Sequence, residues 1–330
     1  MHKRFWMAMV LAFFLVLPAA TPVLSWDKII SFGDSLSDDG NGGANNFPGI
    51  IPEGMTGPSS DGPVWLTYLA DTMTAGELEG RAIGGARTSG PVWDGGLDIG
   101  MEAQVDRYVT IFREQDLSNT LFTIWIGGND LLLPLWKLYA DQGAGVPIDA
   151  AYLRTFSFML FAIIGPAIDS FEASTQKLID AGAQDILVMT MPDLGLAPAI
   201  TSAGSTVAEV YTVISDYYNQ LLLEKVCALR SQNQGKLVQF YVADTFKLLQ
   251  FAVDNAAELG FENTMYPCSD TGMDCSVSIF YDGIHPTTHT HQYLAALALG
   301  QVKHGSVSPD LNAMLMKLVS LNPRMPFVCQ

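Results

Sequence analysis

The chain has 330 residues, of which 49% are apolar and 15% charged, with 30 glycines and 17 prolines. This composition is typical of a globular protein and excludes a disordered or collagen-like chain. Its 34 acidic and 17 basic residues give a formal net charge of −17, so phosphate backbones and anionic lipid surfaces would repel it. Composition and charge therefore argue against a nucleic-acid-binding protein.

The N-terminal segment has the pattern of a secretory signal peptide. Lys3 and Arg4 give it a positive start, an uncharged apolar run follows over residues 5–17, and small residues lead up to Ser25. The apolar run is shorter than the roughly 20 residues of a membrane-spanning helix. We expect cleavage after residue 25, with an uncleaved anchor as the alternative. The mature chain, residues 26–330, is then expected to be a single domain that is secreted or periplasmic.

Short apolar segments alternate with longer helical patterns along the rest of the chain. Runs rich in Ile, Val, Leu and Phe without polar alternation predict strands of a parallel sheet that is covered on both faces. The predicted strands cover residues 28–33, 80–84, 120–127, 185–191 and 236–243. The predicted helices cover residues 64–73, 102–114, 152–181, 207–231 and 292–299. Gly165-Pro166 is expected to kink or split the third of these helices.

This alternation predicts an α/β fold with an open parallel sheet, and the absence of internal repeats or linkers favours one domain. In such sheets, ligands bind beyond the carboxyl ends of the strands. Gly-rich loops that carry polar side chains follow three of the predicted strands, and they begin at Gly33, Gly84 and Gly127. We expect the chemistry of the protein at these loops.

The loops and one later segment hold the residues that serine hydrolase chemistry needs, namely a hydroxyl, a base, a group that orients the base, and donors for an oxyanion. Ser35 offers the hydroxyl, and a helix N-terminus is expected there to present backbone N–H groups. His285 can act as the base, with Asp282 holding its other ring nitrogen. Gly85 can donate a backbone N–H and Asn129 its side-chain amide. Each residue alone is more typical of a turn or a helix cap, so the prediction depends on their joint occurrence.

Four segments of the chain resemble the sequence blocks of the GDSL (SGNH) hydrolases. The first block is matched by SFGDSLSD at residues 31–38, the second by GGA at 84–86, the third by GGND at 127–130, and the fifth by DGIHPT at 282–287. The blocks follow the order of the family. The resemblance implies a three-layer α/β/α sandwich of flavodoxin type with about five parallel strands. It also implies ester hydrolysis without a metal or an organic cofactor.

The resemblance further implies a role for each matched residue. Ser35 would be the nucleophile and Asp282 with His285 the catalytic dyad, while the Ser35 N–H, Gly85 and Asn129 would form the oxyanion hole.

Two departures from related patterns affect these assignments. The second block often opens with Asn five residues before its oxyanion glycine, whereas this chain has Gly80 there, so Gly84 is an alternative to Gly85. The Gly-x-Ser-x-Gly elbow of α/β-hydrolases is absent because Ser37 takes the place of the last glycine. This argues against the broader lipase fold and for the GDSL type.

Within the family, the chain looks most like secreted bacterial phospholipases, a branch with lysophospholipase A, glycerophospholipid acyltransferases and thermolabile haemolysins. The segments that carry this likeness are SDDGN at residues 37–41, DGPVW at 61–65 and HPT at 285–287. A lipid ester substrate and transient contact with membrane lipid are therefore expected. The apolar stretches 155–168 and 131–138 could line an acyl groove, although a buried core helix is slightly favoured over a groove.

Three alternatives remain open. A carbohydrate acetylesterase could use the same triad, with Trp65, Trp93 and Trp136 stacking on sugars. A secreted binding protein with an inert triad is a second alternative. The third is a metal enzyme built on Asp282, His285, His289 and His291, but the His-x3-His-x-His spacing does not place all three rings on one helical face. We expect His289 and His291 to face solvent at the start of the last helix.

The four cysteines all lie in the second half of the chain. An exported chain with an even number of cysteines is expected to oxidise them, and four cysteines allow three pairings. Cys268 and Cys275 are close enough in sequence to close a small loop, which favours Cys227 with Cys329 as the second pair.

Overall fold

The computed structural model describes residues 26–47, 51, 57–73, 76–91, 96–111, 116–302, 313–314, 316–318, 320 and 329. The predicted signal peptide, residues 1–25, lies outside the described residues, and so does Trp93. The cleavage expected after residue 25 therefore stays a prediction.

A five-stranded sheet forms the centre of the described structure, with strand order β2-β1-β3-β4-β5. The strands are β1 (Lys28–Gly33), β2 (Glu77–Gly80), β3 (Thr120–Trp125), β4 (Asp185–Met189) and β5 (Gln239–Ala243). All four neighbouring pairs are parallel. This order is the flavodoxin-like one, in which the chain reverses its direction of progress between β1 and β3. The predicted α/β class with five parallel strands is confirmed.

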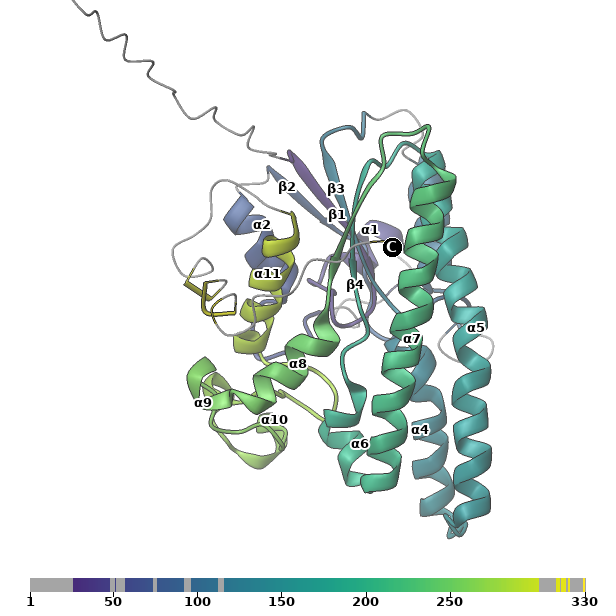
Figure 1. Cartoon of the computed structure of the whole chain (residues 1–330), viewed down its shortest axis with the longest axis vertical. Coiled ribbons are helices and arrows are strands. Elements are labelled where there is room, and N and C mark those ends of the chain that lie inside the picture. Colours follow the sequence, from purple (N-terminus) through teal and green to yellow (C-terminus); the bar gives the residue numbers. More distant parts are fainter. Residues whose placement is uncertain are drawn as a thin grey trace, which may run out of the picture.

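Helices cover both faces of the sheet and complete three layers (Figure 1). One layer holds α2 (Trp65–Met73), α8 (Thr245–Asp254) and α11 (Thr288–Val302). The other layer holds α3 (Met101–Ile111), α5 (Ala150–Asp180) and α7 (Ser205–Gln232). The remaining helices are α1 (Gly42–Asn46), α4 (Gly128–Gly143), α6 (Pro198–Ser202), α9 (Ala256–Leu259) and α10 (Cys268–Thr271), with 3-10 turns η1 (Leu194–Leu196) and η2 (Cys275–Val277). Because both faces are covered, all six residues of β3 are buried.

Two predicted elements need correction. The strand predicted over residues 80–84 is wrong, since β2 ends at Gly80 and pairs with β1 from Lys28↔Glu77 to Ser31↔Gly80. This edge strand carries Glu77 and Glu79, whose carboxylates pair with Lys28, so it lacks the apolar run of a central strand. A split at Gly165-Pro166 is also wrong, because α5 continues through Pro166 as one helix, whereas the alternative of a kink there stays a prediction.

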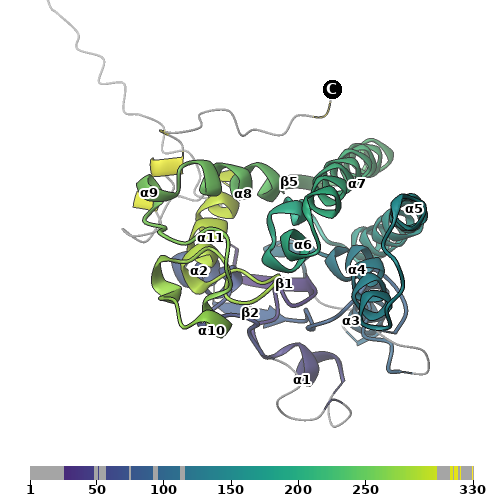
Figure 2. The same ribbon diagram turned by 90° about the horizontal axis from the view of Figure 1, so that it is seen from below.

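The helices α4, α6 and α7 and the start of α5 extend beyond the carboxyl end of the sheet on one side (Figures 1 and 2). On the other side, α8, α9 and α10 extend beyond the same edge. Among the described helices, α5 alone is long and apolar enough to cross a membrane by length and composition. Its contacts with α3, α4 and α7 are those of a helix that covers a sheet.

Both disulfides follow the favoured pairing, Cys227 with Cys329 and Cys268 with Cys275. The first ties α7 to the C-terminal end of the chain, and the second closes a small loop between α10 and η2. One contiguous cluster of buried side chains extends from Trp26 to Leu318. The described residues therefore share a single core, and the single domain expected over residues 26–330 stays a prediction.

Candidate active site

Ser35 lies in a tight turn directly after β1, where the strand reaches the carboxyl edge of the sheet. The Asp34 carboxylate accepts a hydrogen bond from the Leu36 N–H at 3.0 Å, and the Asp34 carbonyl accepts one from the Ser37 N–H at 3.0 Å. These bonds make the segment a turn rather than the first turn of a helix. The helix N-terminus expected at Ser35 is therefore wrong, since the next helix, α1, begins at Gly42.

The hydroxyl of Ser35 contacts the imidazole of His285, although the two residues are 250 positions apart. Ser35 Oγ and His285 Nε2 are 2.7 Å apart, and His285 Nδ1 and Asp282 Oδ2 are also 2.7 Å apart. The structure thus brings together three of the predicted site residues in one continuous hydrogen-bonded line. This geometry allows Asp282 to accept a proton-bearing Nδ1 while Nε2 faces the hydroxyl.

Asp282 is placed to remain a carboxylate. Its Oδ1 accepts hydrogen bonds from the backbone N–H groups of Ile284 and His285, each at 2.8 Å. Burial raises the pKa of Asp282, but the hydrogen bonds and the charge of His285 outweigh burial and hold it below its ordinary value. The loop is held from α6, because the Ala199 N–H donates to the Gly283 carbonyl at 2.8 Å.

The second and third Gly-rich loops lie beside this turn. Gly84 packs against Ser35, and its N–H donates to the Asp38 carboxylate at 2.8 Å, so this N–H is already occupied. Gly85, which has a φ of +82°, offers the next N–H of the loop. Asn129 Nδ2 donates one hydrogen to the Ala86 carbonyl at 2.9 Å, which orients the amide and leaves its second hydrogen for another acceptor.

The N-terminus of α4 points at the same place. Asn129 is the second residue of this 16-residue helix, and it lies with Gly128 and Ser35 in the wall of one pocket. A helix N-terminus carries a partial positive charge and free N–H groups, which favour an anion. Gly127, with a φ of +110°, turns the chain from β3 into α4. The residues around Ser35 can therefore stabilise negative charge.

Three more carboxylates support these loops. Asp38 binds Gly84 as described, and Asp130 accepts hydrogen bonds from the N–H and hydroxyl of Thr88 at 2.9 Å each. Burial raises the pKa of Asp34 to about 7 and that of Asp38 to about 6, and it also raises the pKa of Asp130. In the sequence, Asp34, Asp38 and Asp130 were noted only as members of the segments that resemble the GDSL blocks, not as residues that hold the loops. The signal that could have revealed this role is an aspartate placed beside a Gly-rich loop, where it can accept hydrogen bonds from backbone N–H groups.

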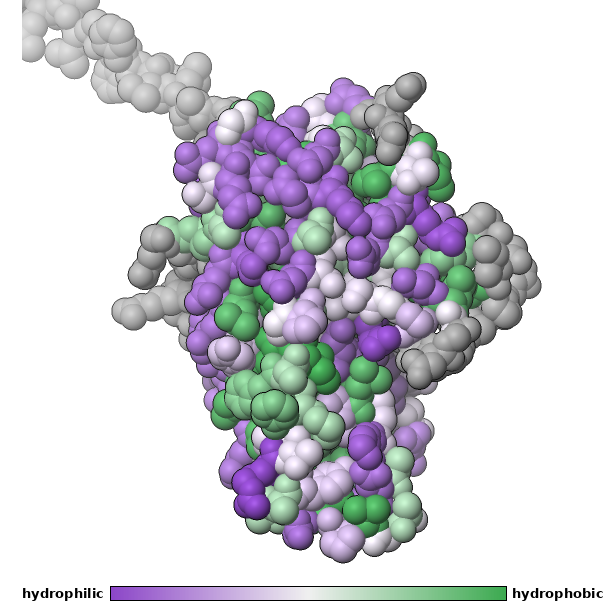
Figure 3. Space-filling model, turned by 90° about the vertical axis from the view of Figure 1, so that its right-hand side faces the viewer, coloured by the Kyte–Doolittle hydropathy of each residue, from purple (hydrophilic) through white to green (hydrophobic). Residues whose placement is uncertain are grey.

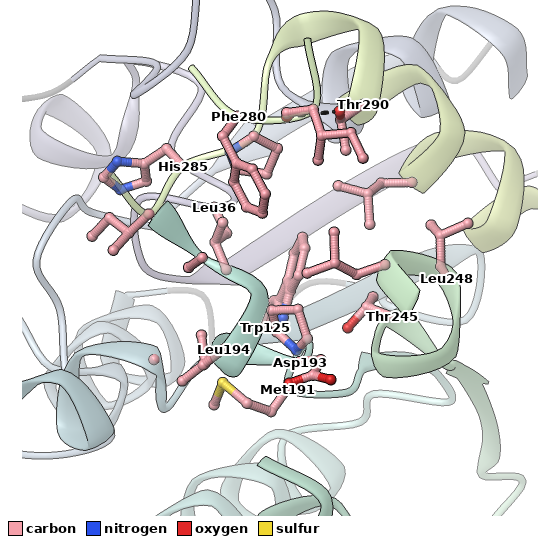
Figure 4. Close-up of a pocket in the computed structure, with 18 of the residues that line it drawn as sticks. Leu36, Trp125, Met191, Asp193, Leu194, Thr245, Leu248, Phe280, His285 and Thr290 are labelled. Atoms are coloured by element: carbon pink, nitrogen blue, oxygen red, sulfur yellow. Dashed lines mark hydrogen bonds between the residues drawn. The ribbon is translucent and has the colours of Figure 1, made fainter. Parts of the chain in front are cut away.

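A narrow pocket with a cavity volume of about 60 Å³ extends from Ser35 and His285 between the sheet and the α8 and α11 layer. In Figure 4 the side chains of His285 and Leu248 lie at opposite ends of it. The apolar residues that line it are Leu36, Trp125, Leu132, Met191, Pro192, Leu194, Ala197, Leu248, Leu249, Ala252, Phe261, Ile279, Phe280, Ile284, Pro286, Tyr293 and Leu294. A pocket with such walls fits an apolar group attached to a reacting carbonyl.

Residues 155–168, for which a buried core helix was slightly favoured over a groove, do not line the pocket, whereas Leu132 of the 131–138 stretch does. The inner side of α5 packs in the core through Phe156, Leu160 and Ile164. Its outer side is exposed, with Phe158 73% accessible, and apolar residues gather on the lower half of this face (Figure 3). The apolar stretch is therefore part core and part surface.

Two of the tryptophans considered for sugar stacking have different environments. Trp65 is fully buried at the start of α2, so it cannot stack on a sugar. Trp136 on α4 is 45% exposed and stacks on Tyr139 with ring centroids 6.4 Å apart. Of these two, Trp136 alone is available to a ligand.

The histidines considered as metal ligands face different partners. His285 faces Ser35, His289 Nδ1 lies 2.7 Å from the Ser276 carbonyl, and His291 Nδ1 accepts a hydrogen bond from the Trp65 N–H at 3.3 Å. His291 is only 1% exposed, so the expectation that it faces solvent is wrong. Its position on the inner side of α11 explains this. The described residues hold no group of three or more His, Cys, Asp or Glu side chains arranged to bind a metal ion.

Comparison with known proteins adds family information to this geometry. The sequence profile of GDSL-like Lipase/Acylhydrolase matches residues 29–298. The Thermolabile hemolysin of Vibrio parahaemolyticus is 29% identical over 294 residues, covering 82% of this chain and 62% of that protein. The Phosphatidylcholine-sterol acyltransferase of Aeromonas hydrophila is 28% identical over 238 residues, covering 68% of this chain and 62% of that protein. The chain thus spans less than two thirds of the length of these relatives.

Another relative is the Acetylesterase of Thermothelomyces thermophilus, which is 25% identical and covers 86% of this chain and 90% of that protein. Among solved structures, phospholipase A1 from Streptomyces albidoflavus NA297 is similar with a TM-score of 0.46 and 15% identity. That similarity covers 88% of this chain and all of the other chain.

Proposed function

The chain belongs to the GDSL-like lipase/acylhydrolase family, and on this basis we propose that it is a serine esterase that hydrolyses carboxylic esters of lipids. The observation that carries the proposal is the contact of Ser35 Oγ with His285 Nε2 at 2.7 Å at the mouth of an apolar pocket. The reaction then needs no metal and no organic cofactor.

In the proposed mechanism, Ser35 Oγ attacks the ester carbonyl carbon while His285 Nε2 takes the hydroxyl proton. Asp282 stabilises the imidazolium through its hydrogen bond to Nδ1. The oxyanion accepts hydrogen bonds from the Ser35 N–H, the Gly85 N–H and the free amide hydrogen of Asn129. The carbonyl re-forms, the alcohol leaves with the proton from His285, and an acyl-serine remains. A water molecule that gives its proton to His285 then attacks this acyl group, and the carboxylic acid is released as Ser35 regains its proton.

The pocket favours an acyl chain over an acetyl group. Its walls are apolar from Leu36 to Leu248, and a chain that enters between them would contact apolar side chains that an acetyl group does not reach. We therefore propose a phospholipase or lysophospholipase type of activity, with transient contact to membrane lipid. The alternative, a carbohydrate acetylesterase with the same triad, predicts preference for acetylated sugars instead.

The proposal also includes export. We propose that residues 1–25 are a signal peptide and that residues 26–330 act outside the cytoplasm. The disulfides Cys227–Cys329 and Cys268–Cys275 support export, since disulfides persist in oxidising compartments.

The test compares the wild-type protein with the Ser35→Ala variant. We expect Ser35→Ala to lower kcat for a soluble aryl butyrate by at least about a thousandfold and to prevent covalent labelling by a fluorophosphonate. The variant should keep the wild-type thermal unfolding temperature. Ser231→Ala, which removes an exposed hydroxyl on α7, is the matched control and should leave both readouts unchanged. Retained turnover in Ser35→Ala would remove Ser35 as the nucleophile.

A substrate panel separates the lipid and the sugar interpretation. We would measure fatty acid released from lysophosphatidylcholine and acetate released from acetylated xylan by the same preparation. Faster release of fatty acid supports the proposal. A preference for acetate would establish the acetylesterase alternative, and the absence of labelling in the wild type would indicate an inert binding protein.

A further inference from the structure

The segment from Ser60 to Trp65 bridges the loop of Ser35 and the loop of His285 without belonging to the triad. At one end, Ser60 Oγ donates to the Pro286 carbonyl at 3.0 Å, and Asp61 Oδ1 accepts the Thr288 N–H at 2.7 Å. At the other end, the indole N–H of Trp65 donates to the hydroxyl of Ser37 at 3.1 Å. The bridge therefore reaches Ser37, two residues after Ser35, at one end and Pro286, directly after His285, at the other.

The bridge also ties α2 and α11 through reciprocal caps. Asp61, four residues before α2, caps the first N–H of α11, which belongs to Thr288. In return, His291 on α11 accepts the first N–H of α2, which belongs to Trp65, at 3.3 Å. Burial lowers the pKa of His291 to about 3, so its ring stays neutral and keeps a lone pair for this bond. The start of α11 is thus fixed by Asp61 of the bridging segment, and the start of α2 is fixed by His291 of α11.

The two segments approach each other more closely than side chains usually permit. Thr288 Oγ1 donates to the Pro63 carbonyl at 2.9 Å and lies 2.7 Å from the hydroxyl of Tyr68. A Cβ on Gly62 would lie 2.9 to 3.2 Å from Thr288 side-chain atoms. The glycine therefore permits a contact that fixes the start of α11 against the segment before α2.

We propose that the segment Ser60–Trp65 sets the separation between Ser35 and His285, with Asp61 as the positioning residue. The proposal rests on the serine esterase mechanism above. The His285 N–H donates to Asp282 Oδ1 at 2.8 Å, and the His285 carbonyl accepts the Tyr281 N–H at 2.9 Å. Beyond His285, Thr287 is bonded to Ile279 and Ser278, and the bonds from Ser60 to Pro286 and from Asp61 to Thr288 tie this segment to the Ser35 side. A displacement of about 1 Å between nucleophile and base is enough to slow such a reaction by about a hundredfold.

The test compares Asp61→Ala with Asp61→Asn on a soluble aryl butyrate. Asparagine keeps the Oδ1 acceptor for the Thr288 N–H and loses only the charge, whereas alanine loses the acceptor. We expect Asp61→Ala to lower kcat by about 10- to 100-fold with KM within about twofold of the wild-type value, and Asp61→Asn to remain within about threefold in kcat. Asp71→Ala removes another exposed carboxylate, this one within α2, and should behave as the wild type.

A second readout follows the geometry without substrate turnover. The rate of fluorophosphonate labelling of Ser35 should fall in Asp61→Ala by the same factor as kcat, because both need His285 as the base. Wild-type kcat in Asp61→Ala, or equal losses in the alanine and asparagine variants, would overturn the proposal.

Two controls keep the result interpretable. If Asp61→Ala does not fold, Ser60→Ala removes the bond to Pro286 and a longer contact with Asp61 Oδ1 at 3.4 Å, and it should lower kcat several-fold at an unchanged unfolding temperature. An unchanged kcat in that variant would overturn the proposal. The wild-type protein, measured alongside, separates the two claims: if it neither hydrolyses the ester nor reacts with the probe, the proposed function itself fails and the positioning role falls with it.

Discussion

Carboxylates near Ser35 occupy environments that drive their pKa values in opposite directions. Asp282 has 34% of its side chain exposed and accepts two backbone N–H groups as well as the His285 ring. Asp34 is 2% exposed, and burial raises its pKa to about 7, with the nearby Asp130 adding to the rise. Asp282, hydrogen-bonded to His285, is therefore kept as an anion, whereas Asp34, the neighbour of Ser35 in the chain, is kept protonated in weakly acidic solution.

The raised pKa of Asp34 makes stability depend on pH. The folded state holds a proton at Asp34 up to about pH 7, whereas the unfolded chain loses it near pH 3.8. The folded state therefore binds more protons between these values, and the free energy of unfolding decreases as the pH rises from about 4 to 7. Asp34→Asn keeps the shape and removes the charge. We expect this variant to gain unfolding temperature relative to the wild type between pH 5 and pH 8.

The measurement is thermal unfolding of both proteins at pH 5 and pH 8, in a Ser35→Ala background so that changes in activity do not interfere. Asp216→Asn, an exchange at an exposed carboxylate on α7, is the control for the chemical substitution. A difference between Asp34→Asn and the wild type that is the same at both pH values would contradict the prediction.

At the scale of secondary-structure elements, the sequence predicted those strands best whose residues follow a single pattern of burial along their whole length. The strands β1 and β3 are mostly apolar and buried because both faces of the sheet are covered, and their predicted starts at Lys28 and Thr120 are correct. The edge strand β2 was misplaced because it carries two acids: Glu77 is 63% exposed, and Glu79 is buried because it pairs with Lys28, a fact of tertiary structure.

The site was predictable to the extent that it consists of loop residues with distinctive chemistry. Ser35, Asp282 and His285 were named from their residue types, and the structure brings them together. The pocket walls were not predictable, because Leu248 and Ala252 on α8 are ordinary apolar residues whose pattern indicates burial but not what they face. His291 was misplaced for the same reason, since the sequence does not reveal which side of α11 faces the core.

The position of α8 at the far end of the pocket leads to a prediction on chain length. Replacing Leu248 by Trp fills space opposite His285, equivalent to about two methylenes of an acyl chain. Each methylene contributes about 0.8 kcal/mol on burial, so kcat/KM for a dodecanoyl ester should fall by at least about tenfold relative to an acetyl ester. Aryl esters of increasing chain length measure this ratio.

The control for the added indole is Leu237→Trp, since Leu237 is 82% exposed and lies before β5. It should leave the chain-length profile unchanged. Equal losses for short and long esters in Leu248→Trp would show that α8 does not limit the acyl group.

At the scale of the whole molecule, the two disulfides close loops of very different length. Cys227 and Cys329 are 102 residues apart, so their bond restricts a large part of the unfolded chain. Cys268 and Cys275 are 7 residues apart. Loop-closure entropy then assigns about 4 to 5 kcal/mol to the long loop and about 2 to 3 kcal/mol to the short one.

The short loop has a second role, because it is bonded to the segment that leads into Asp282. The Cys268 N–H donates to the Phe280 carbonyl at 3.1 Å, and the Ser269 N–H donates to the Tyr281 carbonyl at 2.9 Å. Loosening this loop should therefore move the acid that orients His285, whereas the long-range disulfide starts from α7, remote from Ser35.

These differences predict opposite outcomes for the two paired removals. The variant with Cys227→Ser and Cys329→Ser should lose the larger share of its free energy of unfolding while its kcat stays near the wild-type value. The variant with Cys268→Ser and Cys275→Ser should lose less stability but several-fold more kcat, because Asp282 is no longer held in line. Urea unfolding and kcat for an aryl butyrate, measured on both variants below their unfolding transitions, give the comparison, and each variant serves as the control for the other. If the short-loop variant keeps wild-type kcat, the Cys268–Cys275 bond stabilises its region without positioning Asp282.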